Sequence, residues 1–154
     1  MFLYRVVESL AKHKVDYALV GGFAVALHGA VRGTIDVDLV IRLQKKQFQL
    51  AEVALKDLGL ISRLPVTADN VFEFREEYIQ NRNLIAWSFY NPQIPSEILD
   101  IIITHDLGKM KVVKIKSATH VLKVLDRRDL IAMKRLSGRP QDLEDIKALE
   151  ALAK

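Results

Sequence analysis

A glycine pair stands between a short apolar run and a run of small residues near the N-terminus of the chain. The apolar run at residues 17–20 has the length and composition of a buried strand, and Gly21 and Gly22 end it. Small and apolar residues at 23–27 predict a tightly packed helix directly afterwards. Such a turn exposes backbone N–H groups at the positive end of a helix, which favours an anion such as a phosphate. A simple turn is the alternative for the glycine pair alone.

Two aspartates follow within the same stretch of sequence. Alternation at residues 34–41 predicts a second strand whose apolar side chains share one face, namely Ile35, Val37 and Leu39. Asp36 and Asp38 share the other face, because side chains two residues apart in a strand point the same way. Like charges this close favour a cation, and hard oxygen ligands suit Mg²⁺ or Mn²⁺. A metal site beside a phosphate site indicates phosphoryl or nucleotidyl transfer, whereas an exposed strand face is the alternative for the aspartates alone.

The rest of the sequence predicts further helices and strands. Helical spacing of apolar residues predicts helices at 2–13, 44–58, 127–136 and 140–152, with Asp126 as the N-cap of the third. Apolar runs between turn residues predict strands at 84–90 and 97–104, and either a hairpin or two short strands at 111–116 and 120–125. Residues 60–83 are polar and predict an irregular or partly helical excursion. We therefore expect one α/β (α+β) domain over residues 1–154, with a small mixed β-sheet flanked by helices and with C-terminal helices.

Composition excludes several classes of protein. Half of the residues are hydrophobic and none is cysteine, so the chain is globular and has neither disulfides nor cysteine-ligated zinc. No apolar run approaches the roughly 20 residues that span a bilayer. The N-terminal residues carry charges within their apolar run and do not resemble a signal peptide. These features predict a soluble, cytoplasmic protein without a membrane partner.

Basic residues concentrate in the second half of the chain. Between residues 109 and 139, ten lysines and arginines are opposed by only two acids, Asp126 and Asp129, which gives the stretch a net charge of +8. A basic region of this size is typical of contact with nucleic acid or nucleotide phosphates. A solvated face of a hairpin and a helix is the alternative interpretation.

The glycine and aspartate pairs together resemble a known signature. The string VGG, ending at Gly22, and the string DVD, ending at Asp38, resemble the signature of the DNA polymerase β-type nucleotidyltransferase superfamily. The fuller string GGFAVALHGAVRGTIDVDLVI is similar to the minimal nucleotidyltransferases of toxin–antitoxin systems, including the AbiEii-type toxins. The tail LIAMKRLSGRPQDLEDIKAL resembles a C-terminal pattern of the same proteins. The resemblance implies the nucleotidyltransferase fold, a nucleoside triphosphate (NTP) as substrate and Mg²⁺ or Mn²⁺ as cofactor.

The resemblance also implies roles for individual carboxylates. Asp36 and Asp38 correspond to the family's metal ligands, which hold the ions that bind the triphosphate. Asp100, in the apolar strand at 97–104, corresponds to a third carboxylate that completes the second metal site and helps to activate the attacking hydroxyl. Glu97 and Asp106 are alternatives for this third position.

Other residues of the family pattern face the nucleotide. Gly21 and Gly22 correspond to the phosphate-binding turn, although many members have Gly-Ser where this chain has Gly-Gly. Arg32 and Thr34 precede the metal-binding strand, where they are expected to contact phosphates, and Lys134 is expected to reach the nucleotide. Purely structural roles are the alternatives for several other residues: His28 packs at a helix end, Trp87 lies in the core, and the C-terminal acids stabilise the helices.

The function implied by the resemblance is transfer of a nucleoside monophosphate from an NTP to a hydroxyl. The acceptor is a tRNA end or other RNA, or a partner protein of a toxin–antitoxin pair. Two alternatives stay open: a non-catalytic nucleotidyltransferase-fold partner such as an antitoxin or subunit, and a small-molecule, antibiotic-type nucleotidyltransferase. The chain lacks a P-loop, a G-x-G-x-x-G string, H-E-x-x-H and G-x-S-x-G, which removes the common competing enzyme classes.

Overall fold

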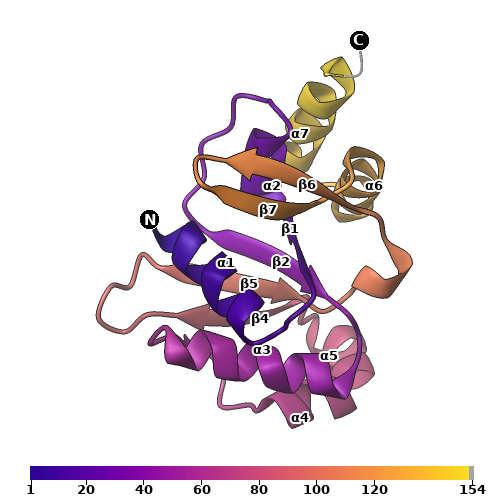
Figure 1. Ribbon diagram of the computed structural model, residues 1–154. Coiled ribbons are helices and arrows are strands. Elements are labelled where there is room, and N and C mark those ends of the chain that lie inside the picture. The colour runs from indigo at the N-terminus through magenta and orange to yellow at the C-terminus, as the bar shows by residue number, and fades with distance from the viewer. Residues whose placement is uncertain (153–154) are drawn as a thin grey trace.

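One mixed β-sheet runs through the described part of the chain, residues 1–152 of the computed structural model. Its strands are β1 (Tyr17–Val20), β2 (Val37–Ile41), β3 (Ile61–Ser62), β4 (Ala86–Tyr90), β5 (Ile98–Ile102), β6 (Val112–Ser117) and β7 (His120–Leu125). They form a seven-stranded sheet in the order β3-β4-β5-β2-β1-β7-β6 (Figure 1). The pairs β1–β7 and β2–β5 are parallel and the others are antiparallel. The predicted α/β class with a mixed sheet is confirmed.

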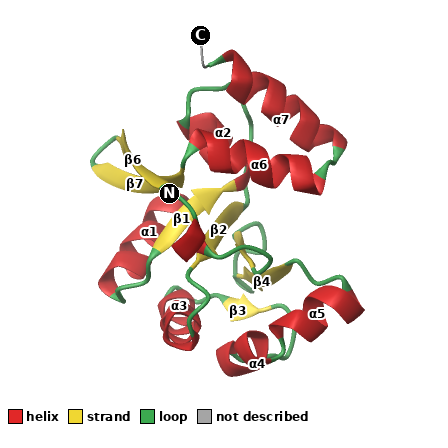
Figure 2. Ribbon diagram, turned by 90° about the vertical axis from the view of Figure 1, so that its right-hand side faces the viewer, coloured by secondary structure: helices red, strands yellow, loops and turns green. Residues whose placement is uncertain are grey.

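Seven α-helices and a short 3₁₀ helix complete the described residues. They are α1 (Phe2–Lys12), α2 (Gly21–Leu27), α3 (Lys45–Asp57), α4 (Ala68–Glu73), α5 (Arg75–Arg82), η1 (Leu107–Lys109), α6 (Arg127–Ser137) and α7 (Pro140–Ala151). Figure 2 shows α2, α6 and α7 gathered at one end of the molecule and α4 and α5 at the other, with the sheet between them. None of these helices is long and apolar enough to cross a membrane.

Helices α1 and α3 cover one face of the sheet. Leu3, Val6 and Leu10 recur at helical spacing on α1 and are almost fully buried. The Ser9 hydroxyl donates to the Ala54 carbonyl at 2.7 Å and ties α1 to α3. On α3, the ring of Phe48 stacks 6.2 Å from that of Trp87 on β4. Because Trp87 is 1% exposed, the prediction that it is a core residue is confirmed, and the large side chains of the sheet point to this helical face.

The C-terminal helices α6 and α7 begin and end where the sequence places their caps. Asp126 caps α6 by accepting from the Arg128 amide at 3.1 Å, as predicted. Gly138 ends α6 in the left-handed conformation (φ 64°), and α7 then starts at Pro140. Gly138 therefore turns the chain sharply, and α7 packs back along α6.

The structure corrects two predicted boundaries in the glycine–aspartate segment. The second strand begins at Val37 and not at residue 34, so Ile35 does not share the buried face and is 71% exposed. The helix predicted at residues 23–27 begins two residues earlier, at Gly21. The excursion at residues 60–83 is partly helical, as expected, because α4 and α5 lie within it. The chain therefore passes from β1 into α2 without a loop, and the connection to β2 lies after the helix.

Candidate active site

The glycine pair makes room for two side chains of the neighbouring segment. Gly21 has a φ of +67°, and a Cβ built on it would lie 2.1 Å from Asp38 Oδ2. A Cβ on Gly22 would lie 2.7 Å from the Thr34 side chain. Val20, the last residue of β1, is paired with Asp38 in the antiparallel β1–β2 ladder, which brings this carboxylate to the start of α2. Glycine is therefore required at residue 21 by both backbone conformation and close approach.

Asp38 and Asp100 lie side by side on the sheet. They are directly paired in the parallel β2–β5 ladder, and both are half-buried. Their neighbours Val37, Leu39 and Ile101 are fully buried on the opposite face, so alternation directs both carboxyl groups away from α1 and α3. The structure thus brings together two of the three carboxylates that the sequence singles out.

The electrostatics of Asp38 reflect this crowding. Burial, the largest cause, together with the charges of Asp100 and Asp36 and a hydrogen bond with Asp100, raises the pKa of Asp38 to about 7. The ammonium of Lys134 acts in the opposite direction with a smaller effect. A bound cation would relieve the repulsion between Asp38 and its neighbouring carboxylates and so would favour the ionised form of Asp38.

Asp36 completes this group, which we call the strand site (Asp36, Asp38 and Asp100). Asp36 lies one residue before β2 and is exposed, yet close enough for its charge to raise the pKa of Asp38. Within residues 1–152, no group of three or more His, Cys, Asp or Glu side chains is placed so that it could hold a metal ion by itself. The donor set nevertheless fits Mg²⁺ or Mn²⁺, which take a few carboxylates and fill their remaining positions with water and substrate phosphates.

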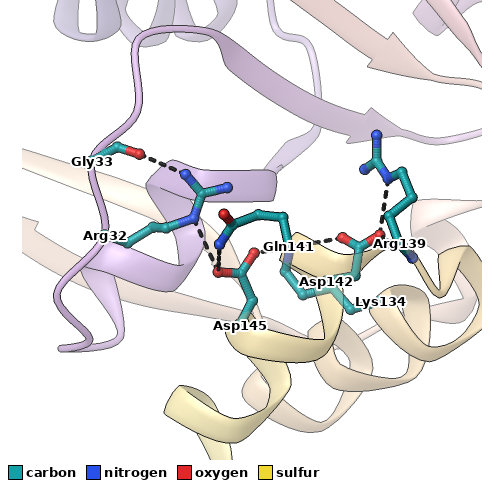
Figure 3. Close-up of polar contacts among 7 residues, drawn as sticks. All are labelled: Arg32, Gly33, Lys134, Arg139, Gln141, Asp142 and Asp145. Carbon is teal, nitrogen blue, oxygen red and sulfur yellow. Dashed lines mark hydrogen bonds and ion pairs between the residues drawn. The ribbon is translucent and has the colours of Figure 1, made fainter.

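A second group of charges joins α6, α7 and the loop before β2. We call it the helix cluster (Arg32, Lys134, Arg139, Asp142 and Asp145; Figure 3). Lys134 is 7% exposed, and its ammonium lies 2.8 Å from Asp145 Oδ2 and 3.5 Å from Asp142 Oδ1. Two buried carboxylates therefore hold the Lys134 ammonium, and its contact with a nucleotide stays a prediction.

Arg32 and Arg139 join the helix cluster from its two sides. Arg32 Nε lies 3.0 Å from Asp145 Oδ1, and its guanidinium also donates to the Gly33 carbonyl. Arg139 Nε lies 2.9 Å from Asp142 Oδ2, and the Arg139 amide donates to the same oxygen. Although burial raises it, hydrogen bonds from Arg139 and Ser137 lower the pKa of Asp142 to about 2. Arg32 thus fastens the loop that carries Thr34 and Asp36 to α7.

The remaining predicted residues have other contacts. Glu97 pairs with Arg5 and accepts from Asn91, and Asp106 accepts from the amides of Leu43 and Gly108. The Thr34 hydroxyl donates to the Asp36 carbonyl at 3.5 Å within its own loop. His28 Nε2 lies 2.8 Å from the Leu125 carbonyl, as expected of a packing residue at a helix end.

Sequence reasoning missed two residues in these groups. Ser88 on β4 donates to Asp100 Oδ1 at 2.5 Å, and Gln141 on α7 donates to Asp145 Oδ1 at 3.0 Å. A polar residue between two aromatics marks Ser88 as facing away from the core. Its partner could not be known without the strand register. Gln141 and Asp145 are four residues apart, a spacing that places them on one helical face.

Similarity to known proteins lies in the fold. The chain matches no protein-family model and no curated protein. Its fold is similar to ANT(2")-Ia in complex with adenylyl-2"-tobramycin (TM-score 0.65, 11% identity), with 99% of this chain and 87% of that chain covered. It is also similar to the lincosamide antibiotic adenylyltransferase LnuA with bound lincomycin (TM-score 0.62, 17% identity; 98% and 96% covered).

A third similar structure is an antigenic nucleotidyltransferase-like protein from Paracoccidioides brasiliensis. It has a TM-score of 0.60 and 18% identity, with 98% of this chain and 75% of that chain covered. All three likenesses extend over nearly the whole of this chain, including residues 60–83. The chain has the nucleotidyltransferase fold.

Proposed function

We propose that the protein is a metal-dependent nucleotidyltransferase that moves a nucleoside monophosphate from an NTP to a hydroxyl acceptor. The observation that carries the proposal is the pairing of Asp38 with Asp100 on adjacent parallel strands, beside the backbone of Gly21. Carboxylates placed for a divalent cation, next to a strand-to-helix turn without side chains, suit a substrate with a triphosphate. The fold supports the same chemistry, because the similar structures include two nucleotide-transferring enzymes.

The strand site would bind the metal ions. Asp36 and Asp38 would hold the ion on the triphosphate, and Asp38 with Asp100 would hold the ion near the attacking hydroxyl. When bound, Mg²⁺ or Mn²⁺ neutralises charge on the phosphates and lowers the pKa of the hydroxyl. The raised pKa of Asp38 supports this assignment, since the charge of Lys134 lowers that pKa by less than burial and the neighbouring carboxylates raise it.

The chain's other residues position the reactants. Gly21 and Gly22 would let the phosphates approach the backbone, and Arg32 and Thr34 would border them from the loop before β2. The oxygen of the acceptor hydroxyl would attack the α-phosphorus, and Asp100 would accept the proton of that hydroxyl. The bond between that phosphorus and the oxygen bridging to the β-phosphate breaks, and pyrophosphate leaves.

The acceptor has two candidates. The motif resemblance to toxin–antitoxin nucleotidyltransferases supports an RNA, such as a tRNA end, or a partner protein. The similarity to ANT(2")-Ia and LnuA supports a small-molecule hydroxyl, because the structures of those proteins contain adenylyl-2"-tobramycin and lincomycin. A shared fold does not determine the acceptor, since one fold can serve many different substrates.

The test is transfer of label from α-³²P-labelled ATP, GTP, CTP or UTP with Mg²⁺. Parallel reactions contain tRNA, a total protein fraction, tobramycin or lincomycin as acceptor. We expect one acceptor to be labelled by the wild-type protein and not by the variant with Asp36→Asn and Asp38→Asn. Asp69→Asn, an exposed change on α4, serves as the matched control. Label transfer that survives in the double variant would overturn the assignment of Asp36 and Asp38 as metal ligands. A stable complex with another protein that forms without NTP, in the absence of label transfer, would favour the non-catalytic alternative.

A further inference from the structure

Ser88 occupies a fixed position opposite the strand site. It is paired directly with Asp100 in the antiparallel β4–β5 ladder. Its neighbours Trp87 and Phe89 are 1% and 0% exposed and anchor β4 in the core. Because side chains alternate along a strand, burial of these two rings forces Ser88 onto the face that carries Asp38 and Asp100.

The Ser88 hydroxyl holds one oxygen of Asp100. Ser88 Oγ donates to Asp100 Oδ1 at 2.5 Å, across a ladder in which directly opposed Cβ atoms lie about 5 Å apart. The backbone of Ser88 is also fixed on its other side, since its carbonyl accepts from the Arg63 amide at 2.8 Å. The backbone of Ser88 therefore cannot move away from Asp100 without disrupting β3, β4 and the aromatic core, so the hydroxyl stays within reach of Asp100.

The order of the strands determines toward which side of the sheet Ser88 holds the Asp100 carboxylate. Strand β5 lies between β4 and β2, so Asp100 has Ser88 on one side and Asp38 on the other. A carboxylate held by one oxygen toward β4 presents its second oxygen toward β2 and the open face of the sheet. Without that restraint, the Asp100 side chain would be free to change its rotamer and the direction of its oxygens.

We propose that Ser88 is a positioning residue that orients Asp100 for metal binding and for contact with the acceptor hydroxyl. The inference rests on the proposed nucleotidyl transfer for the identity of the reaction. The effect itself is that the Ser88 hydroxyl orients the Asp100 carboxylate. Partners of metal-ligating carboxylates typically contribute about 10- to 100-fold to metal affinity or activity.

The primary test is Mn²⁺ binding by calorimetry in the absence of nucleotide. We expect Ser88→Ala to weaken Mn²⁺ binding about tenfold and Ser88→Thr, which keeps the hydroxyl, to restore it to within about threefold. Ser117→Ala is the matched control, because Ser117 is also half-buried on a strand and hydrogen-bonded, at 2.8 Å to Tyr4. Ser117→Ala should leave Mn²⁺ affinity unchanged, and thermal unfolding verifies that each variant is folded.

The second readout separates positioning from substrate binding. With the acceptor found in the transfer assay, Ser88→Ala should lower kcat about tenfold while KM for the NTP stays within about twofold, since Ser88 contacts Asp100, the carboxylate assigned to the acceptor hydroxyl. Unchanged Mn²⁺ affinity in folded Ser88→Ala would overturn the role of Ser88 and leave the proposed function standing. Absence of Mn²⁺ binding by the wild-type protein would overturn both.

Discussion

The strand site and the helix cluster both place aspartates close together, with opposite electrostatic results. In the strand site, burial and two neighbouring carboxylates raise the pKa of Asp38 to about 7. In the helix cluster, hydrogen bonds from neighbouring groups lower the pKa of Asp142 to about 2 despite burial. The difference lies in the partners. Lys134, Arg32 and Arg139 pair with the aspartates of the helix cluster, whereas no lysine or arginine of residues 1–152 forms a hydrogen bond or ion pair with a strand-site carboxylate. The charges of the helix cluster are paired within the fold, whereas those of the strand site repel one another, which fits the metal site proposed there.

The largest effect is expected from removing the central cation of the helix cluster. Lys134→Met would leave Asp142 and Asp145 buried without their shared ammonium, and should lower the free energy of unfolding by about 3–5 kcal/mol. Urea denaturation followed by circular dichroism measures this loss. Lys147→Met on α7 is the control, because Lys147 is 76% exposed and its removal should change little. A loss below about 1 kcal/mol for Lys134→Met would show that the cluster is not structural.

A backbone change should damage the strand site specifically. Gly21→Ala would force a Cβ into Asp38 Oδ2 and place alanine at a positive φ, which should cost about 2 kcal/mol of stability and abolish nucleotidyl transfer. Gly33→Ala provides the comparison, since no atom lies within 4 Å of its added Cβ. Thermal unfolding and the transfer assay are measured for both variants. Normal activity in Gly21→Ala would contradict the close approach of residue 21 to Asp38.

Acid should weaken the helix cluster through Asp142. Its folded-state pKa, about 2, lies below the ordinary value of 3.8, so the folded protein binds a proton there less readily than the unfolded chain. The resulting stabilisation, roughly 2 kcal/mol, is complete above about pH 5 and is lost as the pH falls toward 2. Unfolding free energies of the wild-type protein and Asp142→Asn measured at pH 5 and pH 2.5 test this. The gap between the two proteins should narrow at the lower pH, and a constant gap would refute it.

In the strand site, removal of a carboxylate charge should raise the free energy of unfolding and not lower it. Asp38→Asn removes one of the mutually repelling carboxylates and should raise the free energy of unfolding by about 1 kcal/mol at pH 8 without divalent cations. Addition of Mg²⁺ should stabilise the wild-type protein and leave the variant unaffected. Thermal melts with and without Mg²⁺ provide the measurement. Destabilisation by Asp38→Asn would mean that its carboxylate serves the fold.

The smallest effect is expected at the rim of the helix cluster. Arg139 pairs with Asp142, but its side chain is 71% exposed, so solvent screens the interaction. Arg139→Gln should lower stability by about 0.5 kcal/mol, measured by the same urea titration used for Lys134→Met. A loss as large as that of Lys134→Met would place Arg139 among the buried partners.

Much of the fold could be predicted because its signals are local. The spacing of Leu3, Val6 and Leu10 indicates α1. Asp126 marks the start of α6 and Gly138 marks its end, and the alternation of apolar residues indicates the hairpin β6–β7. The boundary of β2 was wrong because residues 34–36 have strand-like composition while their position is set by Arg32, which ties this loop to α7. Such a long-range contact leaves no local pattern.

The sequence by itself determined the kinds of chemistry that the chain contains: a glycine pair after a buried strand, two aspartates one residue apart, and a third aspartate in an apolar strand. Periodicity suffices for this, because it fixes which side chains share a face. Only the tertiary structure decided which charges meet. Strand order and register placed Asp100 beside Asp38 and Ser88 beside Asp100, and the packing of α6 against α7 enclosed Lys134 between two carboxylates. These pairings depend on contacts between residues far apart in the chain, and they separate the charges that stabilise the fold from those that remain available to a cation.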